Sequence, residues 1–227
     1  MVKDFGKSPV QADFSRLLIE GAGKLDLSLT AGQVSAFKKY LRELRVWGER
    51  LNLISRGDDQ EIVFKDLIDS LTVLKYLTQG ASLLDLGSGA GFPGLPLKIV
   101  RSDLRIVLLE ANRKKVYFLK NIIRLLRLEG IAVCWSGGEG KRDKGSLGVF
   151  DFVISRAFGP LLKFSAEGLS FLKPGGFLIA MKGKKGEAEL QKDLPALEKM
   201  GLKQAFLDRL LLPFLGHERV LIGLRKE

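Results

Sequence analysis

The sequence lacks features that several classes of protein require. Its 227 residues include a single cysteine, Cys134, so no disulfide can form within the chain and no cysteine cluster can hold zinc. No stretch approaches the ~18 consecutive apolar residues of a transmembrane helix, and the N-terminal segment has no apolar core of a signal peptide. One histidine, His217, is present, and there is no internal repeat or Pro-rich linker. These features predict a cytoplasmic protein with no metal site and no membrane segment.

Acidic residues are in short supply relative to basic ones. The chain has 37 Lys and Arg against 26 Asp and Glu, a net charge of +11, with the hydrophobic fraction of an ordinary globular protein, 46%. Residues 1–80 carry 12 basic and 11 acidic side chains, whereas residues 81–227 carry 25 and 15. The positive charge favours an anionic partner, which could be nucleic acid, a membrane surface or a phosphorylated small molecule. It places that partner on the part of the chain after residue 80.

Periodicity also changes near residue 80. Before it, apolar residues recur at helical spacing in three stretches, around residues 17–18, over 34–51 and over 62–77. Thr30 is placed to cap the second of these helices. We therefore expect residues 1–80 to form a small helical region that packs against a domain formed by residues 81–227.

After residue 80, short apolar runs alternate with longer helical segments such as residues 113–128. This pattern predicts βαβ units and a parallel sheet covered on both faces. The expected parallel strands are Ala81–Leu86, Arg105–Glu110, Ile131–Trp135, Phe150–Ser155 and Phe177–Met181. Two further extended runs, Gln204–Leu212 and Arg219–Leu224, would add a C-terminal pair. The fold class predicted is α/β, an open, doubly wound and mostly parallel sheet with an N-terminal helical extension.

Glycines are concentrated after the first expected strand. Residues 83–94 read Leu-Leu-Asp-Leu-Gly-Ser-Gly-Ala-Gly-Phe-Pro-Gly, an apolar strand that enters a loop of alternating glycines. Glycine permits positive φ and lets the backbone approach a ligand that a Cβ would keep away. Open α/β sheets bind nucleotides at this position. The loop is therefore the candidate cofactor site.

Two cofactors fit this loop. From Gly89 it matches the G-x-G-x-x-G fingerprint of an NAD(P)-dependent oxidoreductase. From Asp85 it is Asp-x-Gly-x-Gly-x-Gly, in which an acid within the strand suits the cation of S-adenosylmethionine better than a pyrophosphate. Glu110, nineteen positions after Gly91, could accept hydrogen bonds from the ribose of either cofactor. Asp85 and Gly87 favour the methyl donor, and a nucleotide-sensing module without turnover is a third possibility.

Several separate segments carry a family resemblance. They are residues 47–53 (Trp-Gly-Glu-Arg-Leu-Asn-Leu), 67–70 (Leu-Ile-Asp-Ser), 85–97 (ending Phe-Pro-Gly-Leu-Pro-Leu), 114–119 (Lys-Lys-Val-Tyr-Phe-Leu), 155–158 (Ser-Arg-Ala-Phe) and 181–183 (Met-Lys-Gly). Together they resemble the bacterial glucose-inhibited division protein B family of small-subunit ribosomal RNA guanine-N7 methyltransferases. Gly48, Asp66 and Gly137 replace the family's usual Asn, His and Arg. Another RNA or a small molecule therefore remains an alternative substrate.

The resemblance implies a class I, Rossmann-like methyltransferase domain over residues 81–227. It also implies S-adenosylmethionine as cofactor, and N7 of a guanine in 16S ribosomal RNA of the small ribosomal subunit as the methyl acceptor. We expect a monomer. The cofactor-binding residues expected from the loop and the resemblance are Asp85, Gly87, Ser88, Gly89, Gly91, Phe92, Glu110, Ala111, Gly138, Glu139 and Arg156.

Four basic residues are candidates for the substrate side. Arg156 follows the fourth strand and is the predicted catalytic residue, because a guanidinium can bind O6 of a guanine or a phosphate. Relatives also use this Arg as a cofactor contact, so its role stays open. Lys114 and Lys115 open a helix and Lys182 follows the fifth strand. All three are predicted to bind RNA phosphates, with an ordinary solvated charge as the alternative for Lys182.

Some residues required by other methyltransferases are missing. Guanine N7 has an in-plane lone pair and no proton to remove, so its methylation needs alignment rather than a general base. The chain has no Asn/Asp-Pro-Pro-aromatic motif after the fourth strand, which exocyclic-amine methyltransferases use. Cys134 lies within an apolar run and is expected to be a buried structural thiol rather than a nucleophile. The pattern therefore favours transfer to a ring nitrogen.

Overall fold

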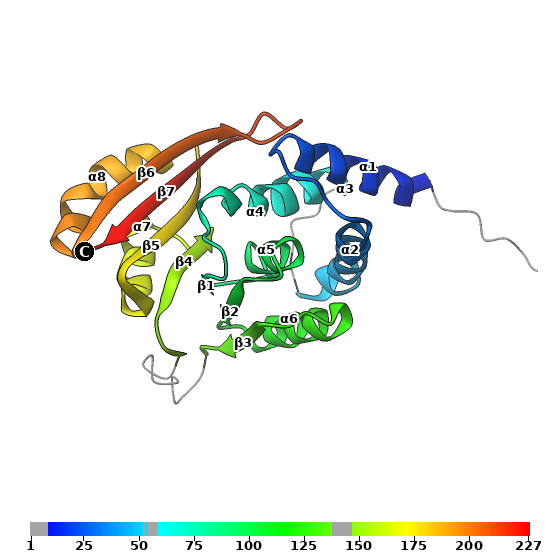
Figure 1. Cartoon of the computed structure of the whole chain (residues 1–227), viewed down its shortest axis with the longest axis horizontal. Coiled ribbons are helices and arrows are strands. Elements are labelled where there is room, and N and C mark those ends of the chain that lie inside the picture. Colours follow the sequence, from blue (N-terminus) through cyan, green and yellow to red (C-terminus); the bar gives the residue numbers. More distant parts are fainter. Residues whose placement is uncertain (1–8, 52, 54–58, 138–146) are drawn as a thin grey trace, which may run out of the picture.

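The computed structural model describes residues 9–51, 53, 59–137 and 147–227 (Figure 1). Helices precede the first strand, and among the described residues an α-helix then follows each of the first, second, fourth and fifth strands. In chain order the α-helices are α1 (Pro9–Gly23), α2 (Ala31–Leu51), α3 (Asp59–Glu61), α4 (Asp69–Leu71), α5 (Gly94–Val100), α6 (Arg113–Leu126), α7 (Leu161–Gly168) and α8 (Gly186–Lys199). A π-helix, η1 (Ile62–Ile68), joins α3 to α4, and short 3₁₀ turns are η2 (Leu74–Tyr76) and η4 (Leu169–Phe171).

Helix α2 begins as its sequence predicts. Thr30 Oγ1 accepts a hydrogen bond from the N–H of Gln33 at 3.2 Å, and Gln33 Oε1 accepts one from the N–H of Thr30 at 2.8 Å. This reciprocal pair satisfies two N–H groups that the first turn leaves without helical partners. Gln33 Nε2 also donates to the oxygen of Val100 at 3.0 Å, which ties the start of α2 to the end of α5.

The helix expected over residues 62–77 is not a single regular helix. The structure divides it into η1, α4 and η2, and the apolar side chains of η1 are buried. A π-turn carries one extra residue per turn, and such turns often occur at functional sites. Apolar spacing in the sequence does not distinguish these helix types, because each of them can bury a similar set of residues.

The sheet confirms the predicted architecture. In the part of the chain that the structure describes, the sheet has seven strands, which are β1 (Ser82–Leu86), β2 (Arg105–Glu110), β3 (Ile131–Trp135), β4 (Phe150–Arg156), β5 (Leu172–Gly183), β6 (Leu202–Leu211) and β7 (Glu218–Lys226). They lie in the order β3-β2-β1-β4-β5-β7-β6, and β7 is antiparallel to both of its neighbours. The first five strands are mutually parallel, so their carboxyl ends share one edge. The order changes direction at β1, where a doubly wound sheet offers a binding crevice.

Helices cover both faces of the sheet (Figure 1). Successive strand residues point to opposite faces, so each strand supplies both cores. On one face α5, α6 and the N-terminal helices cover a core that includes Leu83, Ile106, Ile154 and Ile179. On the other face α7 and α8 cover Leu84, Leu109, Val153 and Leu178. The N-terminal helices therefore share a core with the sheet.

Candidate active site

The glycine loop, residues 87–93, lies at the carboxyl end of β1 and is bonded to the end of β2. The N–H groups of Gly87 and Ser88 both donate to the main-chain oxygen of Leu109, at 2.9 and 3.1 Å. The hydroxyl of Ser88 donates back to the main-chain oxygen of Asp85 at 3.0 Å. The loop is thus fixed to two adjacent strands rather than free to move.

Three predicted loop glycines have distinct surroundings. Gly87, Gly89 and Gly91 all adopt positive φ, of 76°, 58° and 103°. A Cβ on Gly91 would meet Leu95 at 2.3 Å, so packing requires glycine there. A Cβ on Gly89 would meet only the main-chain oxygen of Gly87, at 3.9 Å. Gly89 therefore faces open space, as expected of a glycine that a ligand approaches.

Asp85 is a buried carboxylate with incomplete hydrogen bonding. Oδ2 accepts the N–H of Gly94 at 2.9 Å, at the start of α5, while Oδ1 has no hydrogen-bond partner among the described residues. Burial raises the pKa of Asp85 to about 7, although the hydrogen bond from Gly94 acts to lower it. A buried oxygen without a donor is costly. The carboxylate fits a cofactor that brings a positive charge or a donor, as S-adenosylmethionine does.

Glu110 ends β2 and orders the segments on either side of the expected ribose position. Oε2 accepts the N–H of Gly89 at 2.7 Å, and Oε1 accepts the N–H of Asn112 at 2.7 Å. Ala111 is exposed, and its main-chain oxygen accepts the indole N–H of Trp135 at 2.8 Å. A carboxylate oxygen can accept more than one hydrogen bond, so Glu110 retains acceptor capacity for ribose hydroxyls.

Helix α2 supports the glycine loop from the N-terminal region. Tyr40 is fully buried, and its hydroxyl donates to the main-chain oxygen of Ala90 at 2.6 Å. Its ring packs on Phe92, with centroids 5.7 Å apart, and on Phe118 of α6 at 6.4 Å. Phe92 is itself buried. One side chain of the helical region thus contacts both the backbone and the aromatic end of the loop.

Arg156 at the end of β4 is held by several groups. Its guanidinium donates to the main-chain oxygen of Lys65 and to Asp66 Oδ1, each at 2.6 Å, and lies 4.8 Å from the centre of the Phe92 ring. The nearest distance from Nη1 to Asp69 Oδ2 is 3.6 Å. Part of the side chain, 22%, remains exposed. The predicted catalytic arginine is therefore oriented by η1 and lies beside the glycine loop.

Asp69 extends this cluster to β7. Its Oδ2 accepts a hydrogen bond from Arg219 Nε at 3.0 Å, and its Oδ1 has no partner among the described residues. Burial raises the pKa of Asp69, whereas Arg219 and Arg156 act to lower it. Two arginines and two aspartates thus form one nearly buried cluster, in which Arg156 is a member rather than an isolated cation.

The predicted substrate lysines are placed differently from one another. Lys114 is exposed and Lys115 partly exposed in the first turn of α6, on the edge that carries the glycine loop. Lys182 has only 15% of its side chain exposed, and its ammonium bonds to the oxygen of Gly159 at 2.6 Å and to Glu189 at 3.0 Å. The structure therefore gives Lys182 an internal contact and leaves Lys114 available to a partner.

The structure describes one of the three remaining predicted positions, Cys134, but not Gly138 or Glu139. Gly138 and Glu139, expected to bind the cofactor, lie outside the described residues. Cys134 is buried in β3 with 7% of its surface exposed, in agreement with the expected structural thiol. The described parts of the chain hold no group of three or more side chains suited to a metal ion, and contain no helix long and apolar enough to cross a membrane.

Three contacts of this site were not predicted from the sequence. They are the bonds of Tyr40 to the loop, of Asp66 to Arg156, and of Arg219 to Asp69, which join residues 50, 90 and 150 positions apart. Asp66 stood out only as a departure from the family pattern. A local motif carries no signal for such pairs, because they depend on how distant segments meet.

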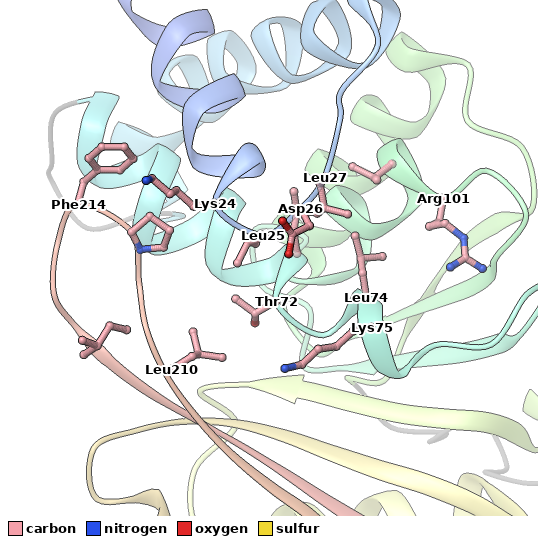
Figure 2. A pocket seen from close by; sticks show the side chains of 14 residues that line it. Lys24, Leu25, Asp26, Leu27, Thr72, Leu74, Lys75, Arg101, Leu210 and Phe214 are labelled. Atoms are coloured by element: carbon pink, nitrogen blue, oxygen red, sulfur yellow. The ribbon is translucent and has the colours of Figure 1, made fainter.

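A separate pocket of about 870 Å³ is lined in part by Val100 and Arg101, at the end of α5 away from the glycine loop. Figure 2 shows the side chains that line it. Leucines from the segment after α1, from the region of α4 and η2, and from β6 line much of it. Lys24, Lys75 and Arg101 are its basic residues and Asp26 its acidic one. Lys75 pairs with Asp208 and Arg101 with Asp103, so two of the three cations already have partners. None of the predicted site residues that the structure describes lines this pocket.

Comparison with known sequences decides the family. Residues 33–213 match the family described as GidB, rRNA small subunit methyltransferase G. The chain belongs to the GidB family. It is 40% identical over 211 residues to the ribosomal RNA small subunit methyltransferase G of Geotalea uraniireducens, covering 93% of this chain and 96% of the relative. It is 37% identical to the enzyme of the same name from Geobacter metallireducens, covering 91% and 93%.

Solved structures support the fold class of this GidB member. A methyltransferase from Pyrococcus furiosus matches with a TM-score of 0.56 at 16% identity, covering 82% of this chain and 96% of that one. TYW2 from M. jannaschii, solved in complex with AdoMet, matches with a TM-score of 0.55 at 17% identity, covering 71% and 76%. The predicted class I methyltransferase fold is confirmed. Family membership also confirms S-adenosylmethionine as the cofactor and does not favour the NAD(P) alternative.

Proposed function

We propose that this GidB family member transfers a methyl group from S-adenosylmethionine to N7 of a guanine in 16S ribosomal RNA. Family membership supports the ribosomal RNA substrate, since the relatives are named small subunit methyltransferases. The geometry that carries the proposal is the glycine loop. Gly89 in the loop faces open space, and the strand that enters the loop carries a buried carboxylate, Asp85, one oxygen of which has no hydrogen-bond partner among the described residues. The proposed partner is accordingly the small ribosomal subunit or its RNA.

Specific residues would hold the cofactor. S-adenosylmethionine supplies a methyl group activated by the positive charge on sulfur. Asp85 would favour the cationic part of the molecule, and Glu110 would accept hydrogen bonds from ribose hydroxyls. The main chain of the loop would contact the cofactor directly at Gly89, because glycine has no side chain to keep it away. These assignments use groups that already lie within the one carboxyl edge of the sheet.

Arg156 is the proposed catalytic residue. Its guanidinium lies at the end of β4 and above Phe92, at the edge where the acceptor base must approach the methyl donor. Binding of O6 of guanine by this cation would align N7 with the methyl donor. A cation does not stabilise the positive charge that the ring gains on methylation, so the contribution of Arg156 would be orientation. Asp66 and Asp69 offset the positive charge of Arg156, since both carboxylates lie within 4 Å of its guanidinium. No general base is needed for a ring nitrogen without a proton.

The decisive experiment is methyl transfer from radiolabelled S-adenosylmethionine to small ribosomal subunits and to free 16S ribosomal RNA, both from a strain without this enzyme. We expect one labelled guanine in one of the two substrates and strongly reduced labelling with the Arg156→Ala variant. Mapping of the modified base by primer extension after cleavage at 7-methylguanine identifies the atom. Label on an exocyclic amine, or on no RNA at all, would contradict the proposal.

The remaining parts of the proposal concern the location and the oligomeric state of the enzyme. We infer that the enzyme acts in the cytoplasm and as a monomer. Size-exclusion chromatography with light scattering, with and without the cofactor, measures the mass directly. A dimer at micromolar concentration would contradict the monomer.

A further inference from the structure

Two exposed aromatic rings and a guanidinium lie together beside the proposed cofactor site. Tyr117 of α6 and Trp135 at the end of β3 are 53% and 42% exposed. The guanidinium carbon of Arg113 is 6.0 Å from the centre of the first ring and 5.7 Å from the second. Lys120 and Arg124 continue along the same helix and are exposed. These five residues are called the α6 surface below.

The α6 surface is strongly basic. Helix α6 contains five Lys or Arg residues and no Asp or Glu. None of these five basic side chains forms an ion pair with any residue that the structure describes, and Arg124 donates only to Asn121, at 3.2 Å. Lys120 and Arg124 repel each other at i, i+4 spacing, and cations in the first turn oppose the helix dipole. The cations of the first turn therefore cost helix stability, whereas Arg124 lies in the last turn, where a cation suits the dipole. A bound polyanion would offset the cost of the first-turn cations.

The position of the surface relates it to the reaction. Trp135 pairs with Glu110 in the register of β3 and β2, so its ring is at the edge that carries the glycine loop. Its indole N–H bonds to Ala111, which fixes the ring beside the segment that follows Glu110. A chain that places one nucleotide near Arg156 can therefore extend along the same edge toward α6.

The combination of groups indicates the kind of partner. A small phosphorylated molecule or an acidic peptide could use the cations but would have no need of two exposed rings next to them. Single-stranded RNA uses both, because its phosphates bind Lys and Arg while its bases stack on aromatic rings and on guanidinium planes. We propose that the α6 surface binds a single-stranded segment of the substrate RNA, with bases stacked on Tyr117, Arg113 and Trp135. The inference rests on the proposed function.

Replacement of Tyr117 tests the stacking contact. Affinity for a fluorescently labelled single-stranded 16S ribosomal RNA oligonucleotide should fall roughly fivefold to 150-fold in Tyr117→Ala, the range expected for one stacked base. Tyr117→Phe keeps the ring and should bind within about twofold of the wild type. In steady-state assays Tyr117→Ala should raise KM for RNA and leave kcat near the wild-type value, because the contact is remote from the reacting atoms. Unchanged KM in Tyr117→Ala would overturn the proposal.

A charge variant tests the phosphate contacts independently. RNA affinity should fall less steeply with salt in Lys120→Ala. The negative slope of log affinity against log salt should become shallower by about 0.7, the value for one phosphate contact on a single strand. Lys192→Ala removes the same charge from an exposed position of α8 on the other face of the sheet, and its slope should equal that of the wild type. Equal slopes for the two variants would overturn the proposal.

Further outcomes separate this inference from the proposed function. If the wild type methylates no RNA, the proposed function fails, whatever the α6 variants do. If the wild type methylates RNA and the α6 variants match it in affinity, salt slope and KM, only the α6 inference fails. If the variants bind and methylate free RNA normally but show a raised KM for assembled subunits, the surface contacts a ribosomal protein, which also overturns the inference. Binding of S-adenosylhomocysteine should be the same in all variants.

Discussion

Asp85 shows how a single buried carboxylate can link stability to pH. Burial raises its pKa to about 7, so the neutral acid is favoured in the folded chain, whereas the unfolded chain ionises near pH 4. Its contribution to stability is therefore complete below about pH 4 and is lost as pH rises through about 7. The loss amounts to about 4 kcal/mol in total. The chain retains Asp85 although its ionisation destabilises the folded state, which is consistent with a role in binding a cation.

Asp85→Asn should therefore change the pH dependence of stability. The variant keeps an oxygen for the N–H of Gly94 but has no titrating group. Between pH 5 and pH 8, the wild type should lose about 2–3 kcal/mol of unfolding free energy relative to the variant. Urea unfolding at several pH values measures this difference. Parallel stability curves for the two proteins would contradict it.

Gly89 offers a second test at the scale of one residue. Asn tolerates positive φ better than most residues, so Gly89→Asn should fold with a loss of about 1 kcal/mol or less. Its side chain would enter the open space beside the loop and reduce affinity for S-adenosylhomocysteine at least about tenfold, or 1.4 kcal/mol. Gly80→Asn is the matched control, since Gly80 has φ of 67°, open surroundings and a place at the opposite end of β1. Isothermal titration calorimetry compares the two; equal affinities would mean that Gly89 does not face the cofactor.

At the scale of elements, α2 is the support of the glycine loop. The hydroxyl of Tyr40 and the main-chain oxygen of Ala90 are both buried, so removing the hydroxyl should cost about 1–3 kcal/mol and loosen the loop. We expect Tyr40→Phe to lower both the melting temperature and the affinity for S-adenosylhomocysteine. Tyr76→Phe also removes a hydroxyl, from a bond to Asp208 away from the loop, and should change the melting temperature alone. A loss of affinity in both variants would show that the effect is general rather than transmitted through the loop.

The sequence predicts strands better than it predicts their contacts. The bounds of β2 and β3 agree with the structure, because their apolar runs end at polar or glycine-containing turns. Strand β5 begins at Leu172, five residues earlier than predicted, since Pro174 and the glycines after it resemble a turn when only local sequence is considered. The cluster of Arg156, Asp66 and Asp69 depends on the π-helical path of η1, which no apolar spacing indicates. The motif thus identifies the loop, while the groups that orient its neighbours follow from tertiary structure.

At the scale of the whole molecule, the expected boundary near residue 80 separates helices from the sheet but does not separate two cores. Phe37 and Tyr40 of α2 belong to the same buried cluster as Leu95 of α5 and Phe118 of α6. A division at residue 80 would leave both parts with exposed apolar surface. The boundary at residue 80 stays a prediction. Calorimetry can test whether the two parts unfold together or separately.

Differential scanning calorimetry should show one cooperative transition for the full chain, with equal calorimetric and van't Hoff enthalpies. A fragment of residues 81–227 should lack a cooperative transition, because its α5 and α6 face would lose the packing of α2. The control is the fragment mixed with a separate chain of residues 1–80, which should recover part of the transition if the two associate. Two resolved transitions in the full chain would support independent domains instead.

The hydrogen bond from Tyr40 to Ala90 also bears on the order of folding. During synthesis α2 leaves the ribosome before β1 and the glycine loop. The face of α2 that is buried in the folded chain therefore stays exposed until the loop, fifty residues later, has been synthesised. We expect the loop to reach its final conformation only after that helix has docked. A ligand of the loop therefore binds only chains in which both halves have assembled, and it stabilises them by mass action. Cofactor binding would thus report completed folding, and cellular cofactor concentration would influence how much of the nascent enzyme survives.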